Sequence, residues 1–106
     1  MAYTTAEYTD VEPVAEGMHF MRDTLDCGSL GFTVLECEAG WEGMSHDHAD
    51  DGQEEVYYLV EGAATIDVAD DEVALEPGEA IRLDPEVDRQ IRVGDVPSTL
   101  VLVGAP

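Results

Sequence analysis

Two histidines separated by one residue, His46 and His48, are the side chains whose type and spacing most clearly indicate chemistry. Side chains alternate along an extended strand, so both imidazoles of such a pair project to the same side. Glu55, on the segment that follows, can face them from a neighbouring strand. Imidazole nitrogen and carboxylate oxygen together suit Mn, Fe, Ni, Cu or Zn without choosing among them. The pattern predicts a site for a divalent transition metal; the alternative is a surface pair in an acidic loop.

The elements that must position these residues are short strands. Apolar and polar residues alternate over brief runs bounded by turn-forming Gly, Pro and Asp, and no stretch has a helical period over eleven residues. About eight such runs at turn spacing predict an all-β antiparallel sandwich or barrel. The expected strands are 18–22, 31–38, 54–60, 63–68, 73–75, 80–83, 89–93 and 99–103.

The positions of these predicted strands divide the chain into an N-terminal arm and one domain. Residues 1–17 show no clear period and are predicted to form an N-terminal arm with one short strand. Residues 18–106 are predicted to form a single β-barrel domain, since about 100 residues bury one core. Strand 54–60 is apolar on both faces and is expected in the middle of a sheet. Phe20 and Phe32 are expected in the core.

The histidine pair and Glu55 lie at defined spacings from two glycines, Gly40 and Gly62. The run reads Gly40-x5-His46-x-His48 … Glu55-x6-Gly62. This run resembles the first motif of the cupin superfamily, and Pro77-Gly78 with Asp84-Pro85 look like the region of the second motif. The resemblance covers roughly residues 31–103. It implies a small single-domain cupin, whose fold is an antiparallel double-stranded β-helix, or jelly-roll barrel.

Carried over residue by residue, the resemblance makes His46, His48 and Glu55 metal ligands. The loop between His48 and Glu55 is longer than the family usually has, so Gln53, on the same face as Glu55 by alternation, is an alternative ligand. The family's second motif supplies a third histidine near residues 89–90. This chain has Arg89 and Gln90 there.

Arg89 leaves three possibilities open, because a guanidinium cannot ligate a metal. A site of two histidines and one carboxylate could remain open for substrate and dioxygen. Arg89 could instead pair with Glu55, leaving a metal-free pocket that binds an anion. Arg89 could also point outward and neutralise local carboxylates.

The resemblance implies a protein that binds a divalent transition metal inside the barrel and a small polar or anionic ligand. If it is an enzyme, it would be a metal-dependent dioxygenase or isomerase, with Tyr57 and Arg89 in the ligand pocket. The alternative is a metal-free, non-catalytic binding or regulatory protein in which Arg89 anchors an anion.

The net charge of the chain restricts which molecules it can bind and indicates the salt concentration in which it works. The 106 residues include 25 Asp and Glu, only 4 Arg and no Lys, for a formal charge of -21. Twelve of the acidic residues lie in residues 1–53 and 13 in 54–106, so they coat the surface. Such a coat is typical of proteins from salt-loving microbes, where molar salt screens charges to a Debye length of about 3 Å. Nucleic acid and anionic membranes are excluded as partners. Asp47, Asp50 and Asp51 are expected to be solvated charges of this coat.

Cysteine usage and apolar patterning give the remaining expectations. Cys27 and Cys37 are the only cysteines, and no signal peptide or long apolar run is evident. A cytoplasmic protein with two reduced thiols is predicted. The outward residues of strand 54–60, together with Val101 and Val103, predict a covered outer sheet, and therefore a homodimer like those of other cupins.

Overall fold

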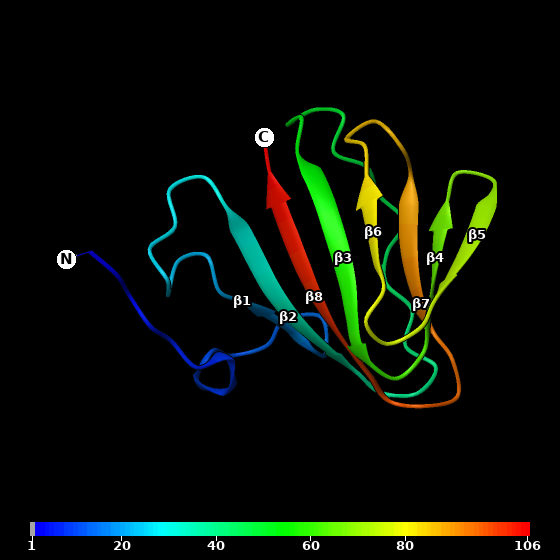
Figure 1. The fold of residues 1–106 in the computed structure, drawn as a ribbon, viewed down its shortest axis with the longest axis horizontal. Helices are drawn as coiled ribbons and strands as arrows, with labels where there is room; N and C mark the ends of the chain where they lie inside the picture. The colour runs from blue at the N-terminus through cyan, green and yellow to red at the C-terminus, as the bar shows by residue number, and fades with distance from the viewer. Residues whose placement is uncertain (1) are drawn as a thin grey trace.

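Strands make up almost all of the regular structure. The computed structural model describes residues 2–106, in which the only helix is a single 3₁₀ turn, η1 (Tyr8–Asp10). No helix in this part of the chain has the length and apolar character needed to span a membrane. Eight strands follow in order (Figure 1): β1 (Met18–Phe20), β2 (Gly31–Cys37), β3 (Glu54–Glu61), β4 (Ala64–Val68), β5 (Asp71–Leu75), β6 (Ala80–Leu83), β7 (Arg89–Val93) and β8 (Ser98–Ala105).

The strands form two antiparallel sheets. The larger has the order β1-β2-β8-β3-β6 and the smaller the order β5-β4-β7. Residues 38–53 form no strand, but single bridges from Glu42 to Arg92 and from His46 to Arg89 hold them along the free edge of β7. The histidine segment therefore extends the smaller sheet and faces the larger one. The predicted antiparallel barrel is confirmed, with β3 in the interior of its sheet.

The core fills one end of the space between the sheets. Leu35, Leu100 and Leu59 are in register across β2, β8 and β3, and all three side chains are completely buried. Ile66 and Ile91 of the smaller sheet pack in the same cluster. Burial of such a side chain contributes about 1.5–3 kcal/mol, so this apolar end holds the sheets together.

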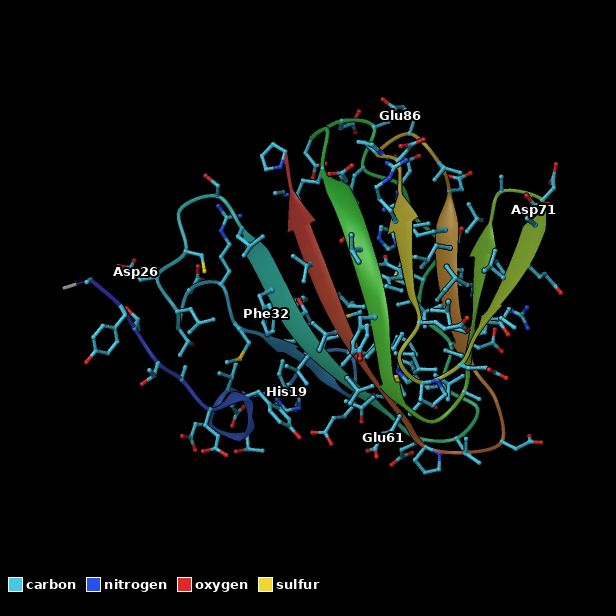
Figure 2. The ribbon with its side chains drawn as sticks, viewed as in Figure 1. His19, Asp26, Phe32, Glu61, Asp71 and Glu86 are labelled. Atoms are coloured by element: carbon cyan, nitrogen blue, oxygen red, sulfur yellow. The ribbon has the colours of Figure 1, made fainter. Side chains whose placement is uncertain are left out.

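The N-terminal arm is attached by His19 rather than by the predicted short strand. Nδ1 of His19 lies 2.8 Å from the Val11 carbonyl oxygen, and the ring packs edge-on against Tyr8 at 5.2 Å between centroids. Figure 2 shows His19 beside the turn of η1. Because this histidine is buried against the arm, it is a structural residue. Met1 of the predicted arm lies outside the described residues.

The expectation that Phe20 belongs to the core is wrong. Its side chain is 52% exposed, although Phe20 is in register with Thr33, whose side chain faces inward. β1 is an edge strand at the end of the sheet where the two layers separate. Phe20 thus faces the space between the sheets without being covered by the opposite layer.

Candidate metal centre

Backbone pairing fixes the two histidines against the smaller sheet. His46 exchanges two hydrogen bonds with Arg89: the His46 N–H donates to the Arg89 carbonyl at 3.0 Å, and the Arg89 N–H donates back at 2.8 Å. The His48 N–H donates to the Pro85 carbonyl at 2.8 Å. The segment is therefore extended, and the alternation predicted for the pair brings both rings to the inner side. Glu55 reaches them from β3 of the larger sheet.

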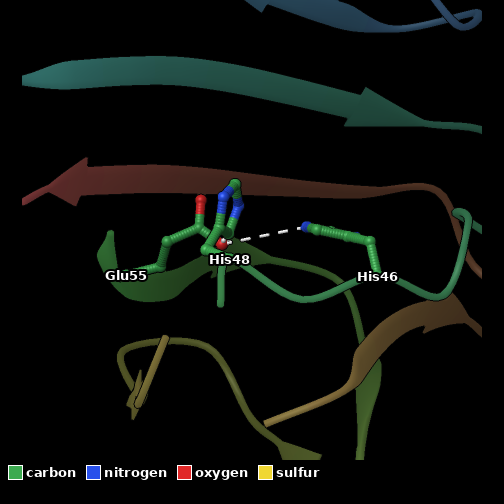
Figure 3. Close-up of side chains that lie close together, drawn as sticks. All are labelled: His46, His48 and Glu55. Carbon is green, nitrogen blue, oxygen red and sulfur yellow. Dashed lines mark ion pairs between the residues drawn. The ribbon is translucent and has the colours of Figure 1, made fainter. Parts of the chain in front are cut away.

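The three side chains meet between the sheets (Figure 3). Nε2 of His48 lies 3.3 Å, and Nε2 of His46 3.9 Å, from Oε1 of Glu55. Metal bonds of about 2.0–2.2 Å to nitrogen and oxygen keep any two donor atoms within about 4.4 Å of each other. Both separations are inside that limit, and the ligand atoms of all three residues lie within 4.8 Å of one another, so the group is a candidate site for one ion.

Hydrogen bonds on the far side of each ring orient the Nε2 atoms that face Glu55. Nδ1 of His46 lies 3.1 Å from the Met44 carbonyl oxygen, and Nδ1 of His48 lies 3.1 Å from both carboxylate oxygens of Asp51. A carbonyl or carboxylate oxygen only accepts, so Nδ1 carries the proton and Nε2 has the free lone pair when the ring is neutral. Both lone pairs are thus directed toward Glu55.

Asp51 is the residue of this site that sequence reasoning missed. It was expected to be a solvated surface charge, but the loop after His48 folds it back onto that ring. The hydrogen bond from His48 lowers the pKa of the Asp51 carboxyl, so it stays an acceptor. Its position three residues after His48 is the only signal that the sequence gives.

Arg89 pairs with Glu55, one of the three possibilities that the sequence left open. Its side chain is fully buried, and Nη1 donates to Oε1 of Glu55 at 2.7 Å. Nε donates to the Val87 carbonyl at 2.9 Å and Nη2 to the Asp84 carbonyl. Arg89 therefore does not point outward, and it lies outside the lining of the large cavity described below.

One oxygen of Glu55 accepts both of its side-chain hydrogen bonds and lies next to both histidine rings. Arg89, Tyr57 and both histidines all approach Oε1, with the Tyr57 hydroxyl donating at 3.1 Å. No side-chain hydrogen bond within residues 2–106 engages Oε2. Pairing with Arg89 and coordination of an ion are hence compatible. Tyr57 is itself buried, which raises its pKa well above the ordinary value and keeps it a neutral donor.

Gln53 and Glu55 lie over a glycine on the neighbouring strand. A Cβ added to Gly104 would come 3.2 Å from Oε1 of Gln53 and 3.3 Å from Cγ of Glu55. The absent side chain provides the space in which both residues lie. Gln53 lines the cavity but makes no hydrogen bond to His46, His48 or Glu55 in the described chain.

The cluster opens into a cavity of about 820 Å³ between the two sheets. Sites for small molecules span about 300–1,000 Å³, so this volume fits a small organic ligand. His46, His48, Gln53, Glu55 and Tyr57 all line it. The rest of its wall is largely apolar and includes Met18, Phe20, Trp41, Ile91 and Leu102.

Comparisons with known proteins agree with this architecture. The family model described as "Cupin domain" matches residues 32–104. A search of curated proteins finds no match. A cupin protein from Bacteroides fragilis has a TM-score of 0.84 at 21% identity, over 99% of this chain and 85% of that one. A protein from Thermus thermophilus has a TM-score of 0.75 at 22% identity, over 96% of both chains.

A third similar structure is named for an activity. It is a sugar phosphate isomerase of the cupin superfamily from Silicibacter pomeroyi, with a TM-score of 0.73 and 22% identity over 84% of this chain and 58% of that one. At such identities the structures show the fold, whereas the family match covers more than half of the sequence. This chain belongs to the cupin family.

Proposed function

We propose that this cupin holds a divalent transition metal through His46, His48 and Glu55, and binds a small polar or anionic molecule in the adjoining cavity. The observation that carries the proposal is the pair of hydrogen bonds at Nδ1, which leave both Nε2 lone pairs directed at one carboxylate. Gln53, which lines the same cavity, is a further candidate ligand.

The protein residues around the ligands have separate roles in this proposal. A bound ion would supply Lewis acidity or a site for dioxygen. Arg89 holds Glu55 in place and balances its charge, because its donors are directed at Glu55 and two carbonyl groups. The Tyr57 hydroxyl donates to the same oxygen. These contacts fix the carboxylate before a ligand enters.

Dioxygenase and isomerase activities are the reactions that we propose if the protein is an enzyme. The similarity to a sugar phosphate isomerase supports the second. The alternative is a metal-free binding or regulatory protein with Arg89 as anion anchor. It has less support, because Arg89 is fully buried and outside the cavity lining.

Metal analysis tests the proposal. After purification in high KCl and exposure to Zn²⁺ or Mn²⁺, wild type should retain about one equivalent per chain, and His46→Ala or His48→Ala should retain less than about a tenth. His19→Ala is the matched control, since this histidine attaches the N-terminal arm. Equal metal content in wild type and His46→Ala, or less than about a tenth of an equivalent in wild type, would refute the site.

We also propose a homodimer that covers the outer face of the larger sheet. Val56, Tyr58 and Val60 of β3 are 36%, 42% and 46% exposed there, beside half-buried Val101 and Val103 of β8. This apolar strip contrasts with the acidic coat of the rest of the chain. A monomer mass by light scattering in molar KCl would contradict it.

The acidic coat supports the further proposal of a cytoplasmic protein from a high-salt environment that binds neither nucleic acid nor anionic membranes. Four arginines cannot neutralise 25 carboxylates, so repulsion within the folded chain is strong in dilute buffer. The melting temperature should therefore rise steeply between low and molar KCl. A flat response would remove the proposal.

A further inference from the structure

Arg22 differs from the other arginines of this acidic chain. Arg82, Arg89 and Arg92 each form an ion pair with at least one carboxylate. Within residues 2–106 Arg22 forms none, although the sequence offers 25 acidic residues. Its side chain donates a hydrogen bond from Nη2 to the Gly28 carbonyl at 3.0 Å. Arg22 also lines the cavity that contains the candidate metal ligands.

The larger sheet brings Arg22 and Glu55 to the same cavity, with β2 and β8 between β3, which holds Glu55, and β1, which Arg22 follows. Glu55 pairs with Gly104 of β8, and Gly104 pairs with Gly31 of β2. β1 pairs with β2 through Phe20 and Thr33, and the Met21 N–H donates to the Phe32 carbonyl beyond the end of β1. Arg22 follows as the first residue of the turn after this pairing. Arg22, Gly31 and Glu55 all line the cavity.

Two glycines lie between Glu55 and the β1 end of the larger sheet, since Glu55 pairs with Gly104 and Gly104 with Gly31. Strands lie about 4.8 Å apart, so the three strand spacings from β1 to β3 amount to about 14 Å. Gly31 and Gly104 have no side chains of their own. The side chains of Gln53 and Glu55 lie over Gly104, whereas Gly31 leaves the floor of the cavity open next to Arg22. A small molecule can lie on this floor with one end at the metal ligands and the other at Arg22.

The walls and the surrounding charges restrict what this molecule can be. Met18, Phe20, Trp41 and Leu102 line the cavity, which suits an apolar body. Glu16, Asp23 and Glu42 also line it, and with a formal charge of -21 they repel a dianion more strongly than a monoanion. A guanidinium presents paired donors that match a carboxylate.

We propose that Arg22 anchors the carboxylate of a small monocarboxylic acid with an apolar body, whose opposite end carries oxygen donors facing His46, His48 and Glu55. The inference rests on the proposed metal site and names the class of its ligand. It transfers the role of anion anchor from Arg89, whose donors are directed at Glu55 and backbone carbonyls, to Arg22.

Two probes that share a catechol ring test the anchor, because one carries a carboxylate and the other a neutral hydroxymethyl group at the same ring position. Isothermal titration calorimetry compares 3,4-dihydroxybenzoate with the neutral 3,4-dihydroxybenzyl alcohol, on both Zn²⁺-loaded and EDTA-treated protein in KCl. The proteins are wild type, Arg22→Gln, Arg22→Lys and the control Arg82→Gln, whose arginine pairs with Glu54 and Asp84 away from the cavity. Zinc content is measured on the same samples.

Wild type and Arg82→Gln should bind the acid about tenfold more tightly than the alcohol, equivalent to about 1.4 kcal/mol. Arg22→Gln should lose that preference while its zinc content and its affinity for the alcohol stay unchanged, and Arg22→Lys should keep part of it. An unchanged preference in Arg22→Gln, or no preference or no binding in wild type, would overturn the anchor. Absence of zinc from wild type would refute the metal site, whereas the acid preference of the EDTA-treated protein would still decide the role of Arg22.

Discussion

The two ends of the barrel are built by the same strands and differ in what those strands place between the sheets. At the closed end, Leu35, Leu100 and Leu59 form one row across β2, β8 and β3, completely buried. At the open end the corresponding row is Gly31, Gly104 and Glu55. The pairing is equally regular in both rows. Small residues in this row, together with the separation of the two sheets, leave a cavity with a carboxylate in it where the other end has a packed core.

This contrast separates residues that stabilise the fold from residues that can act on a ligand. Large apolar side chains at the closed end hold the sheets together without help from the site. The open end can therefore carry charged and exposed groups, including the histidine pair and Arg22. Changes at the closed end should alter stability, and changes at the open end should alter binding.

The largest expected effect comes from shortening a closed-end leucine. Leu100→Ala should lower the free energy of unfolding by about 2–5 kcal/mol, because the methyl groups it removes leave a cavity between packed sheets. Urea unfolding in KCl measures the change. His48→Ala should lose metal yet unfold at nearly the wild-type urea concentration. If His48→Ala is as unstable as Leu100→Ala, the assignment of stability to the closed end and of ligand binding to the open end is wrong.

A smaller effect is expected from the residue that orients His48. Asp51→Ala removes the carboxylate hydrogen-bonded to Nδ1 and should weaken metal affinity by about 10–100-fold. Competition with a zinc-binding dye measures the affinity. Asp50→Ala removes a neighbouring exposed carboxylate and is the matched control. Equal affinities of the two variants would show that Asp51 is only surface charge.

The glycine row offers a pair of substitutions that differ in what they touch. Gly104→Val places side-chain atoms against Gln53 and Glu55 and should weaken metal affinity about tenfold, or about 1.4 kcal/mol. Gly31→Ala meets only the Gly104 carbonyl oxygen at 3.6 Å, an ordinary contact, and should keep wild-type affinity. The same dye competition compares them. Similar metal affinities for Gly104→Val and wild type would show that the space above Gly104 does not position the carboxylate.

The smallest effect is a pH dependence at the closed end. Burial raises the pKa of the Cys37 thiol to about 11 from 9.0, because the thiolate is disfavoured among apolar neighbours. The unfolded chain thus loses this proton first, and stability should fall as pH rises from about 9 to 11. Cys37→Ala should show a shallower decline in urea unfolding over this range. Parallel declines would show that Cys37 does not contribute.

Alternation along the chain predicts most of the fold. It predicts about eight short antiparallel strands, the central position of β3, and the shared direction of His46 and His48, and the structure confirms all three. These are local properties, because period-two patterning needs only the strand itself.

The missed features depend on contacts between segments that no local pattern encodes. Asp51 acts through the fold of a loop, and Gly104 matters only because β8 lies against Glu55. Phe20 reads as a core residue from its type, yet an edge strand at the open end leaves it uncovered. The sequence does not show that Arg22 lines the same cavity as the histidine pair, because the two segments meet only in the folded chain.

An anomalous difference map from a crystal grown in KCl with Zn²⁺ tests the central claim most directly. The predicted result is one peak about 2.0–2.2 Å from Nε2 of His46, Nε2 of His48 and a Glu55 oxygen, with Nδ1 of both rings still hydrogen-bonded to Met44 and Asp51. A map without a peak between these residues, or with a peak bound through Nδ1, would contradict it.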